Sequence, residues 1–419
     1  MRHRGNQGAL RAAWIGCALT ASGVAGLAQN PGEYLSYSWK GVAFQPQFDT
    51  TALFTDNLFY GAGATRVSDF VFTVSPGFRL QYGRDGENQI AFEYMHDETV
   101  VLDHSDFNSR QNRLDLTVRY VQGRLRLEGK DSVQFLSSLL GGSVGTLGQL
   151  VDRVLQSDDY RLTYDWTEKT DFYLRGSHTA ADYDKRTFLL DQRTLEGTLG
   201  TSYQWTPKTR LTVDGFYGAT SIAANAVPVA ASDSRFYGGY VGIRGSFTPK
   251  LSGSARVGYE QRSFVSGDSV SASTPALSFD LAYQLTPMTS MTLRYDRRTF
   301  PSPQFASQIS ISDSVIFQVN QLVGTSGRWL VRGTVRYNHN DLSSTSVASG
   351  GQTIDVQRTD TLMAAGVALI YQPQPWLGCI AAYDFENFDI SFANQAASGL
   401  LQVVSYHNNR LSLSVAIGF

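Results

Sequence analysis

The feature that most constrains this chain is an alternation of apolar and polar side chains with a period of two. It recurs in one short segment after another from residue 42 to the end. Leu114 and Leu116 fall on one face of such a segment, and Arg113 and Asp115 fall on the other. This period is the signature of a β-strand with one apolar and one polar face. The sequence therefore predicts an all-β fold.

About eighteen such segments can be counted. They lie near 42–54, 67–82, 88–102, 109–121, 123–136, 153–165, 169–183, 190–205, 208–220, 234–247, 250–264, 274–285, 288–300, 306–322, 328–341, 356–372, 376–388 and 406–419. Their connections alternate in length. Even-numbered segments end in tight turns, whereas odd-numbered segments are mostly followed by longer, Ser-, Gly- and Asn-rich loops such as 137–152, 221–233, 265–273, 342–355 and 389–405. Transmembrane barrels have short periplasmic turns and longer outer loops, so we predict an antiparallel up-and-down β-barrel with both termini periplasmic.

The polarity of the two faces indicates a membrane protein. No stretch after residue 28 approaches the roughly 18 consecutive apolar residues of a transmembrane helix. A sheet can span a membrane only by closing on itself, because every backbone group must be paired. Apolar residues facing lipid and polar residues facing the inside also explain a mean hydropathy of −0.20. A barrel of sixteen to eighteen strands leaves room for a water-filled channel.

The N-terminus is typical of a secretory signal. Positively charged Arg2 and Arg4 precede a mostly apolar run, and Gly26-Leu27-Ala28 offers a cleavage site with small residues. We expect a signal peptide at 1–28, a periplasmic segment at 29–41 and the barrel at 42–419. A lipoprotein cysteine at Cys17 fits less well. The other cysteine, Cys379, lies in an apolar stretch, where a wall residue is a better interpretation than a nucleophile.

The last segment has the character of a closing strand. It alternates apolar with polar or small residues and ends on an aromatic residue, and its apolar members are Leu411, Leu413, Val415, Ile417 and Phe419. Outer-membrane barrels end in similar strands, which the insertion machinery recognises. Short turns with an aromatic residue before them, such as Trp166-Thr167 and Trp205-Thr206-Pro207, recur about 40 residues apart. The aromatic residues are expected in an interfacial girdle.

The polar face supplies the candidate functional residues. Arg is far commoner than Lys, which favours planar, bidentate contacts with carboxylates. The residues expected to face the lumen are Arg113, Asp115, Arg119, Arg124, Arg126, Glu128, Arg161, Asp165, Arg175, Arg256, Glu260, Asp280, Arg294, Asp296, Arg298, Arg332 and Arg336. No catalytic residue, metal site or cofactor is expected, and the sequence shows no phosphate-binding loop, GxSxG or CxxC motif.

Three other features allow alternatives. The acid and histidine cluster around one outer loop allows a protease pair, a metal site or a lipid-A site, although a solvated loop is the favoured interpretation; its members are His96, Asp97, Glu98, Asp103, His104 and Asp106. Asp56-Asn57 with Asp69 allows a divalent-ion or sugar site, against ordinary polar loop residues. The apolar, Gly-rich segment 137–152 either folds into the mouth or docks a partner, or else extends the two strands that it joins.

The segments Phe54–Phe59 and Ser68–Leu80, with their Asp-Asn and Ser-Asp…Pro-Gly motifs, and the later aromatic-Thr-Pro turns resemble the putative β-barrel porin 2 family. The resemblance covers the mature chain in pattern, but only the first two strands and the turns in residues. It implies an outer-membrane barrel and, because many members are encoded with exopolysaccharide assembly systems, export of an extracellular polysaccharide. It supplies no catalytic residues.

The leading hypothesis is thus a polysaccharide conduit in the bacterial outer membrane. A nutrient porin, general or solute-selective, is the first alternative, followed by an outer-membrane enzyme and a structural or adhesive barrel. Expected partners are outer-membrane lipid, lipopolysaccharide and the barrel assembly machinery, with a polysaccharide and a periplasmic export protein under the leading hypothesis. No nucleic-acid partner is expected. Cargo, gating and oligomeric state are not determined by the sequence.

Overall fold

The protein was analysed as a computed structural model, which describes residues 37–83, 88–142, 149–184, 189–223, 233–265, 271–302, 308–324, 326–349, 352–393 and 404–418. The expected signal peptide, most of the expected periplasmic segment and the final Phe419 lie outside the described residues.

Almost all of the described chain is β-strand. The strands are β1 Tyr37–Trp39, β2 Val42–Thr55, β3 Asp69–Gly83, β4 Gln89–Val101, β5 Ser109–Gln122, β6 Leu125–Leu139, β7 Leu150–Asp165, β8 Thr170–Tyr183, β9 Asp191–Thr206, β10 Thr209–Ala223, β11 Ser234–Ser246, β12 Leu251–Phe264, β13 Ser271–Thr286, β14 Thr289–Pro301, β15 Ile309–Val323, β16 Trp329–Ser349, β17 Gln352–Gln374, β18 Leu377–Phe392 and β19 Tyr406–Gly418. Two 3₁₀ turns, η1 Gly63–Thr65 and η2 Ser105–Phe107, lie in the connections.

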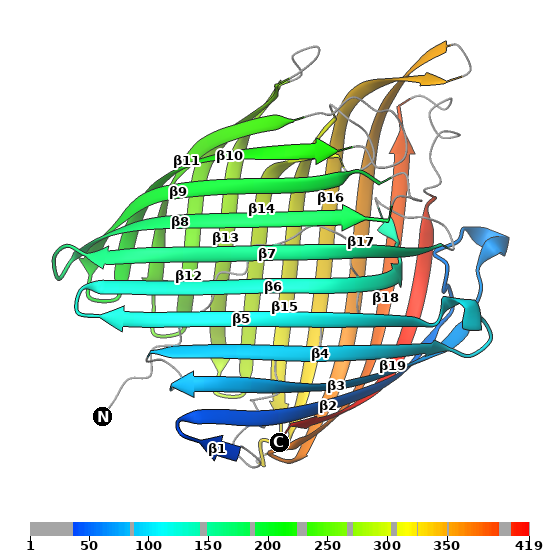
Figure 1. Cartoon of the computed structure of the whole chain (residues 1–419), viewed down its shortest axis with the longest axis horizontal. Helices are drawn as coiled ribbons and strands as arrows, with labels where there is room; N and C mark the ends of the chain where they lie inside the picture. Colours follow the sequence, from blue (N-terminus) through cyan, green and yellow to red (C-terminus); the bar gives the residue numbers. More distant parts are fainter. Residues whose placement is uncertain are drawn as a thin grey trace.

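The strands β2 to β19 form one closed antiparallel barrel. Each pairs with its neighbours in chain order, and β19 pairs with β2 from Arg410 opposite Thr55 to Gly418 opposite Gln47. The predicted barrel of eighteen strands is confirmed. The short β1, which was not predicted, pairs with the start of β2. In Figure 1 the strands of the near wall cross those of the far wall steeply, as expected for strands that tilt against a barrel axis.

The connections are segregated by length. The strand ends joined by short turns lie along the left and bottom of Figure 1, and the strand ends between which the longer connections run lie along the right and top. The prediction of a long loop at 342–355 is wrong, because β16 and β17 continue as a hairpin that pairs Thr345 with Val356 and Ser349 with Gln352. This stretch contains the β-branched residues that favour strands. The ladder is interrupted once, at a register shift between Leu342 and Thr345.

The outer face of the barrel is apolar and the inner face is polar. On β10, Leu211, Val213 and Tyr217 are exposed, whereas Thr212 and Asp214 between them are buried. A soluble barrel would have the reverse arrangement, with apolar side chains filling its centre. The exposed Leu and Val residues therefore form a surface suited to lipid.

Aromatic residues mark the two edges of this surface. Trp166 and Trp205, both exposed, lie at the short-turn end, where the sequence predicted a girdle. Further toward the long loops, tyrosine hydroxyls donate to polar side chains, as in Tyr94 to Asn112 (2.8 Å). Such belts sit at the two interfaces of a bilayer. Within the described residues, no helix is long and apolar enough to span a membrane.

Candidate functional site: the barrel interior and its mouth

The predicted lumen-facing residues are distributed around the barrel. They lie on β5 (Arg113, Asp115, Arg119), β6 (Arg126, Glu128), β7 (Arg161, Asp165), β8 (Arg175), β12 (Arg256, Glu260), β13 (Asp280), β14 (Arg294, Asp296, Arg298) and β16 (Arg332, Arg336). Arg124 differs: it lies in the turn between β5 and β6, where its Nη1 donates to the carbonyl of Trp166 at 3.2 Å. The predicted strand began two residues too early.

Many of these residues form ion pairs across neighbouring strands. The pairs are Arg119–Glu128 (3.8 Å), Lys130–Asp115 (3.9 Å), Arg126–Asp165 (3.3 Å), Arg294–Asp280 (3.0 Å) and Arg175–Asp159 (Nε to Oδ2, 2.8 Å). An opposite charge one strand away stabilises the cross-strand ladder. On β5 to β8 and on β13 and β14, such pairs hold arginine side chains close to the wall.

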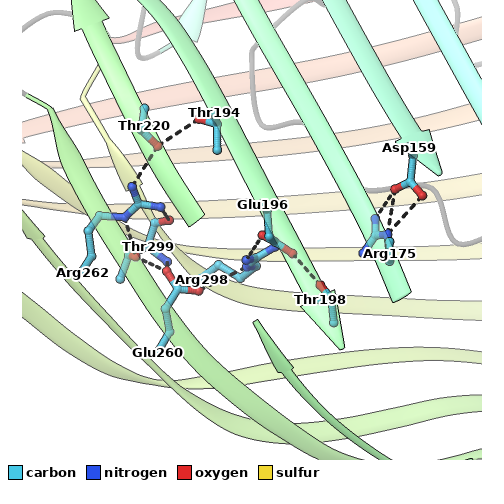
Figure 2. A network of polar contacts seen from close by, with 10 residues as sticks. All are labelled: Asp159, Arg175, Thr194, Glu196, Thr198, Thr220, Glu260, Arg262, Arg298 and Thr299. Carbon is cyan, nitrogen blue, oxygen red and sulfur yellow. Dashed lines mark hydrogen bonds and ion pairs between the residues drawn. The ribbon is translucent and has the colours of Figure 1, made fainter. Parts of the chain in front are cut away.

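A second network joins strands that are far apart along the wall (Figure 2). Arg298 on β14 donates from Nη2 to Glu196 on β9 (2.9 Å) and from Nε to Glu260 on β12 (3.3 Å). Glu260 is fully buried and also accepts from the hydroxyl of Thr299. Because β9 and β14 are five strand steps apart, the wall must bend tightly for these two side chains to meet. The network closes off one corner of the barrel interior.

Arg262 lies beside this network and is almost fully buried. It donates to Thr220 (3.2 Å), Ser234 (3.0 Å) and Thr299 (3.0 Å to the hydroxyl and 3.3 Å to the carbonyl). A buried guanidinium is tolerated when its donors are satisfied and a carboxylate is close. Glu196 was not among the predicted candidates, although the signal was present: it alternates with the exposed Leu195 and with Gly197.

Glycines opposite aromatic rings make the tight corner possible. Phe236 on β11 is opposite Gly218 on β10, and Phe216 on β10 is opposite Gly238 on β11. A Cβ on Gly218 would lie 2.2 Å from the ring of Phe236, and one on Gly238 would lie 2.6 Å from the ring of Phe216. Each ring therefore occupies the space that a side chain on the neighbouring strand would need. Phe216 and Phe236 form a buried cluster with Tyr240.

Arginines cover these inward rings. The contacts from guanidinium to ring centroid are Arg262–Phe236 (4.2 Å), Arg256–Tyr240 (4.9 Å), Arg298–Phe216 (5.4 Å) and Arg161–Tyr173 (3.9 Å). Cation–π contacts of this length add about 0.5–2 kcal/mol each. At these positions guanidinium groups therefore lie over the aromatic rings on the inner side of the wall.

The mouth at the long-loop end is crossed by the residues that follow β6. Gly142 donates its N–H to the hydroxyl of Tyr406 on β19 (2.9 Å), and that hydroxyl donates to the buried carboxylate of Glu386 on β18 (2.7 Å). A Cβ on Gly141 would lie 2.7 Å from the same hydroxyl and 2.8 Å from the ring of Tyr60. Along the wall, β6 and β19 are five strand steps apart. We call residues 140–142 the mouth segment.

The sequence left two alternatives for the region 137–152, and the structure shows parts of both. β6 and β7 extend as paired strands to Leu139 opposite Leu150. Beyond them, the mouth segment leaves the wall and reaches Tyr406, so it narrows the mouth. Leu140 packs with Val151 and Leu189 in a buried apolar cluster, which anchors the start of the segment. Residues 143–148 lie outside the described residues.

Asp56 and Asn57 hold the loop that follows β2 against the start of β19. Asn57 is fully buried; its side chain donates to the carbonyls of Gly61 and His407, both at 2.8 Å. Asp56 accepts from the backbone and side-chain amides of Asn409 (2.7 and 2.6 Å) and from Arg66. Burial alone would raise the pKa of Asp56, but the Asn409 amides and Arg66 together lower it below its usual value.

The remaining acids and histidines do not converge. Asp69 pairs with His104 (2.6 Å), whereas Glu98 pairs with Arg110 (2.9 Å) and lies 3.6 Å from His96. Among the residues that the structure describes, no group of three or more His, Cys, Asp or Glu is arranged to hold a metal ion. The favoured interpretation of these residues, polar groups of the loops and outer rim, agrees with this geometry.

Three comparisons relate the chain to known proteins. The sequence profile of the family described as "Putative beta-barrel porin 2" matches residues 156–415. No curated protein matches significantly. Among solved structures, the FrpB iron transporter of Neisseria meningitidis has 9% identity and a TM-score of 0.49, with 89% of this chain and 81% of that chain covered. OpdK of Pseudomonas aeruginosa has 12% identity and a TM-score of 0.46, with 90% and 99% covered. The profile covers more than half of the sequence, so this chain belongs to the putative beta-barrel porin 2 family and is an outer-membrane β-barrel.

Proposed function

We propose that the protein is a passive channel that carries small hydrophilic solutes across the bacterial outer membrane. The observation that carries the proposal is the opposite polarity of the two faces of the wall. Leu211 and Val213 face outward on the same strand whose inner face carries Thr212 and Asp214. An interior lined by charged and hydroxyl groups offers a solute the hydrogen bonds that it loses on leaving water.

Two features of the interior favour small solutes over polymers. The bridge from Arg298 to Glu196 occupies one corner of the interior, and the mouth segment reaches Tyr406 on β19 at the long-loop end. A polysaccharide, the cargo that the family resemblance implied, would have to pass both in an extended form. Polysaccharide export is therefore the competing proposal, and nutrient uptake is the one that the geometry favours. We propose that the short turns face the periplasm, which is the usual arrangement in outer-membrane barrels.

Liposome swelling with the purified full-length barrel tests the proposal. We expect proteoliposomes to swell in isotonic arabinose and glucose, more slowly in raffinose and not in dextran. Liposomes that contain the same protein, unfolded by heat before reconstitution, are the control. A barrel that admits dextran would support polymer export instead. A barrel that admits none of the sugars would contradict the channel itself.

A further inference from the structure

The positive charges on the inner wall are compensated unevenly. From β5 to β14, most of the predicted inward arginines pair with an acid or cover an aromatic ring, as described above. On β16, by contrast, Arg332 and Arg336 take part in no ion pair with any residue that the structure describes. Their cross-strand neighbours are uncharged: Asn320 and Ala368 for Arg332, and Ile316 and Ala364 for Arg336.

Arg332 is the more unusual of the two. Only 5% of the residue is exposed. Its Nε donates to Oδ1 of Asn320 at 3.2 Å, and the same oxygen accepts from Nε2 of Gln318 at 3.1 Å. Its Nη2 is buried and has no hydrogen-bond partner among the described residues. One edge of the guanidinium is therefore held in place while the other edge has an unused donor.

An uncompensated charge in such a place is unfavourable. Burying an ion without a partner costs several kcal/mol, and an unsatisfied buried donor adds about 1–3 kcal/mol. A replacement by Gln or Leu would remove this penalty. The arrangement becomes favourable when an anion supplies the missing charge and acceptor.

Arg336 lies on the same face of β16, four residues further toward the long-loop end, and is partly exposed. At about 3.3 Å per residue, the two Cα atoms are about 13 Å apart. The residues opposite the two arginines on β17, Ala368 and Ala364, have small, uncharged side chains that neither pair with a guanidinium group nor reach past it into the lumen. A solute that enters from the long-loop end meets Arg336 before Arg332.

We propose that Arg336 and Arg332 form a two-step binding path for solutes that carry an oxyanion group, a carboxylate or a phosphate. The inference rests on the channel function proposed above and names its substrate class. The fork of the guanidinium matches the two oxygens of such a group, and a charge-assisted hydrogen bond is stronger than a neutral one. A neutral sugar of the same size lacks that interaction.

The test compares glucuronate, glucose 6-phosphate and glucose in the same proteoliposome assay. We expect wild-type barrels to admit one or both anions faster than glucose. Arg332→Gln and Arg336→Gln each lower the rate of anion uptake relative to glucose, by about tenfold if one charged hydrogen bond is lost. Arg110→Gln is the control with the same charge change, because Arg110 is 75% exposed and pairs with Glu98 on the outer rim. We expect Arg110→Gln to leave the ratio of anion uptake to glucose uptake unchanged.

Asn320→Asp is a second variant that does not depend on removing an arginine. It places a carboxylate 3.2 Å from Nε of Arg332, so the charge is compensated within the wall and the fold is not weakened. We expect the anion preference to fall as in Arg332→Gln. The difference between glucuronate and glucose 6-phosphate shows which oxyanion the path prefers.

The outcomes separate the two proposals. If wild-type barrels admit glucose and both anions at equal rates, or if Asn320→Asp leaves the ratio unchanged, the anion path is wrong and the channel stands. If wild-type barrels admit no solute, both proposals are wrong. Migration of unheated and heated samples on a gel verifies that each variant forms the barrel.

Discussion

The hydroxyl of Tyr406 accepts a hydrogen bond from the mouth segment and so joins that segment to β19, and Tyr406→Phe removes this hydroxyl. The variant loses the hydrogen bond from the N–H of Gly142 and the one to Glu386. The ring and its contacts with Tyr60 and Phe388 remain. Tyr406→Phe therefore tests the hydrogen bond between Tyr406 and the mouth segment without leaving a cavity in place of the ring.

The expected loss of stability in Tyr406→Phe follows from the two hydrogen bonds that the variant lacks. The neutral bond to Gly142 contributes about 1 kcal/mol, which changes the equilibrium for local opening about fivefold. The bond to Glu386 involves a charged group and contributes about 1.5–3 kcal/mol to the stability of the rim. Glu386 keeps Arg410 as a partner at 3.0 Å, so its carboxylate is not left alone.

Hydrogen exchange at the amide of Gly142 measures the opening directly. We expect exchange to be about fivefold faster in Tyr406→Phe, and the current through single channels to fluctuate more. Tyr94→Phe is the matched control, because the hydroxyl of Tyr94 bonds Asn112 on the outer face. Unchanged exchange in Tyr406→Phe, or an equal acceleration in Tyr94→Phe, would refute the idea that this hydroxyl tethers the mouth.

Three further predictions concern the wall, a loop and the membrane. Gly238→Val prevents barrel formation, judged by gel migration, since a Cβ there would lie 2.1 Å from a carbonyl oxygen of β12, whereas Gly215→Ala folds because its Cβ meets nothing closer than 3.8 Å. Because the pKa of Asp56 in the folded protein is below its usual 3.8, the hydrogen bonds from Asn409 to the Asp56 carboxylate are complete above that pH and are lost as the pH falls through the folded pKa. Proteolysis of the loop at different pH values should show this loss, and Asp56→Asn should abolish the pH dependence. Trp205, 64% exposed at the short-turn end, should be quenched by lipids brominated near the headgroup more than by lipids brominated at the chain ends.

The sequence predicted the wall well because its signal is local. Each strand needs only alternation and a turn, and both are visible within a single stretch of the sequence, which is why even β10 with its four glycine or alanine residues was located. The hairpin of β16 and β17 was missed for the same reason: residues 342–355 contain many Ser and Gly residues that resemble a loop. Their pairing becomes apparent only when the two strands are side by side.

The sequence predicts which residues point into the barrel, but it does not predict which of them contact one another there. Alternation identifies Arg298 and Glu260 as inward candidates, yet nothing local indicates that Arg298 reaches Glu196, 102 residues earlier in the chain. That contact depends on the bend of the whole wall. That Arg332 has no ion-pair partner among the described residues likewise follows from which strands flank β16, and a single sequence does not show it.

The seam between β2 and β19 has a consequence for biogenesis. Thr55 donates to Asn408, Asn57 donates to His407 and Asp56 accepts from Asn409, and each of these contacts joins residues about 350 positions apart. None of them can form until translation and export of nearly the entire polypeptide have finished. The pairing of β2 with β19 is therefore a late step of folding. Until it occurs, the open sheet has two unpaired edge strands, which must be shielded because such edges are templates for aggregation. The loop of residues 56–67 then stabilises the junction between β2 and β19. Substitutions in this loop should therefore slow barrel assembly more than they destabilise the folded barrel.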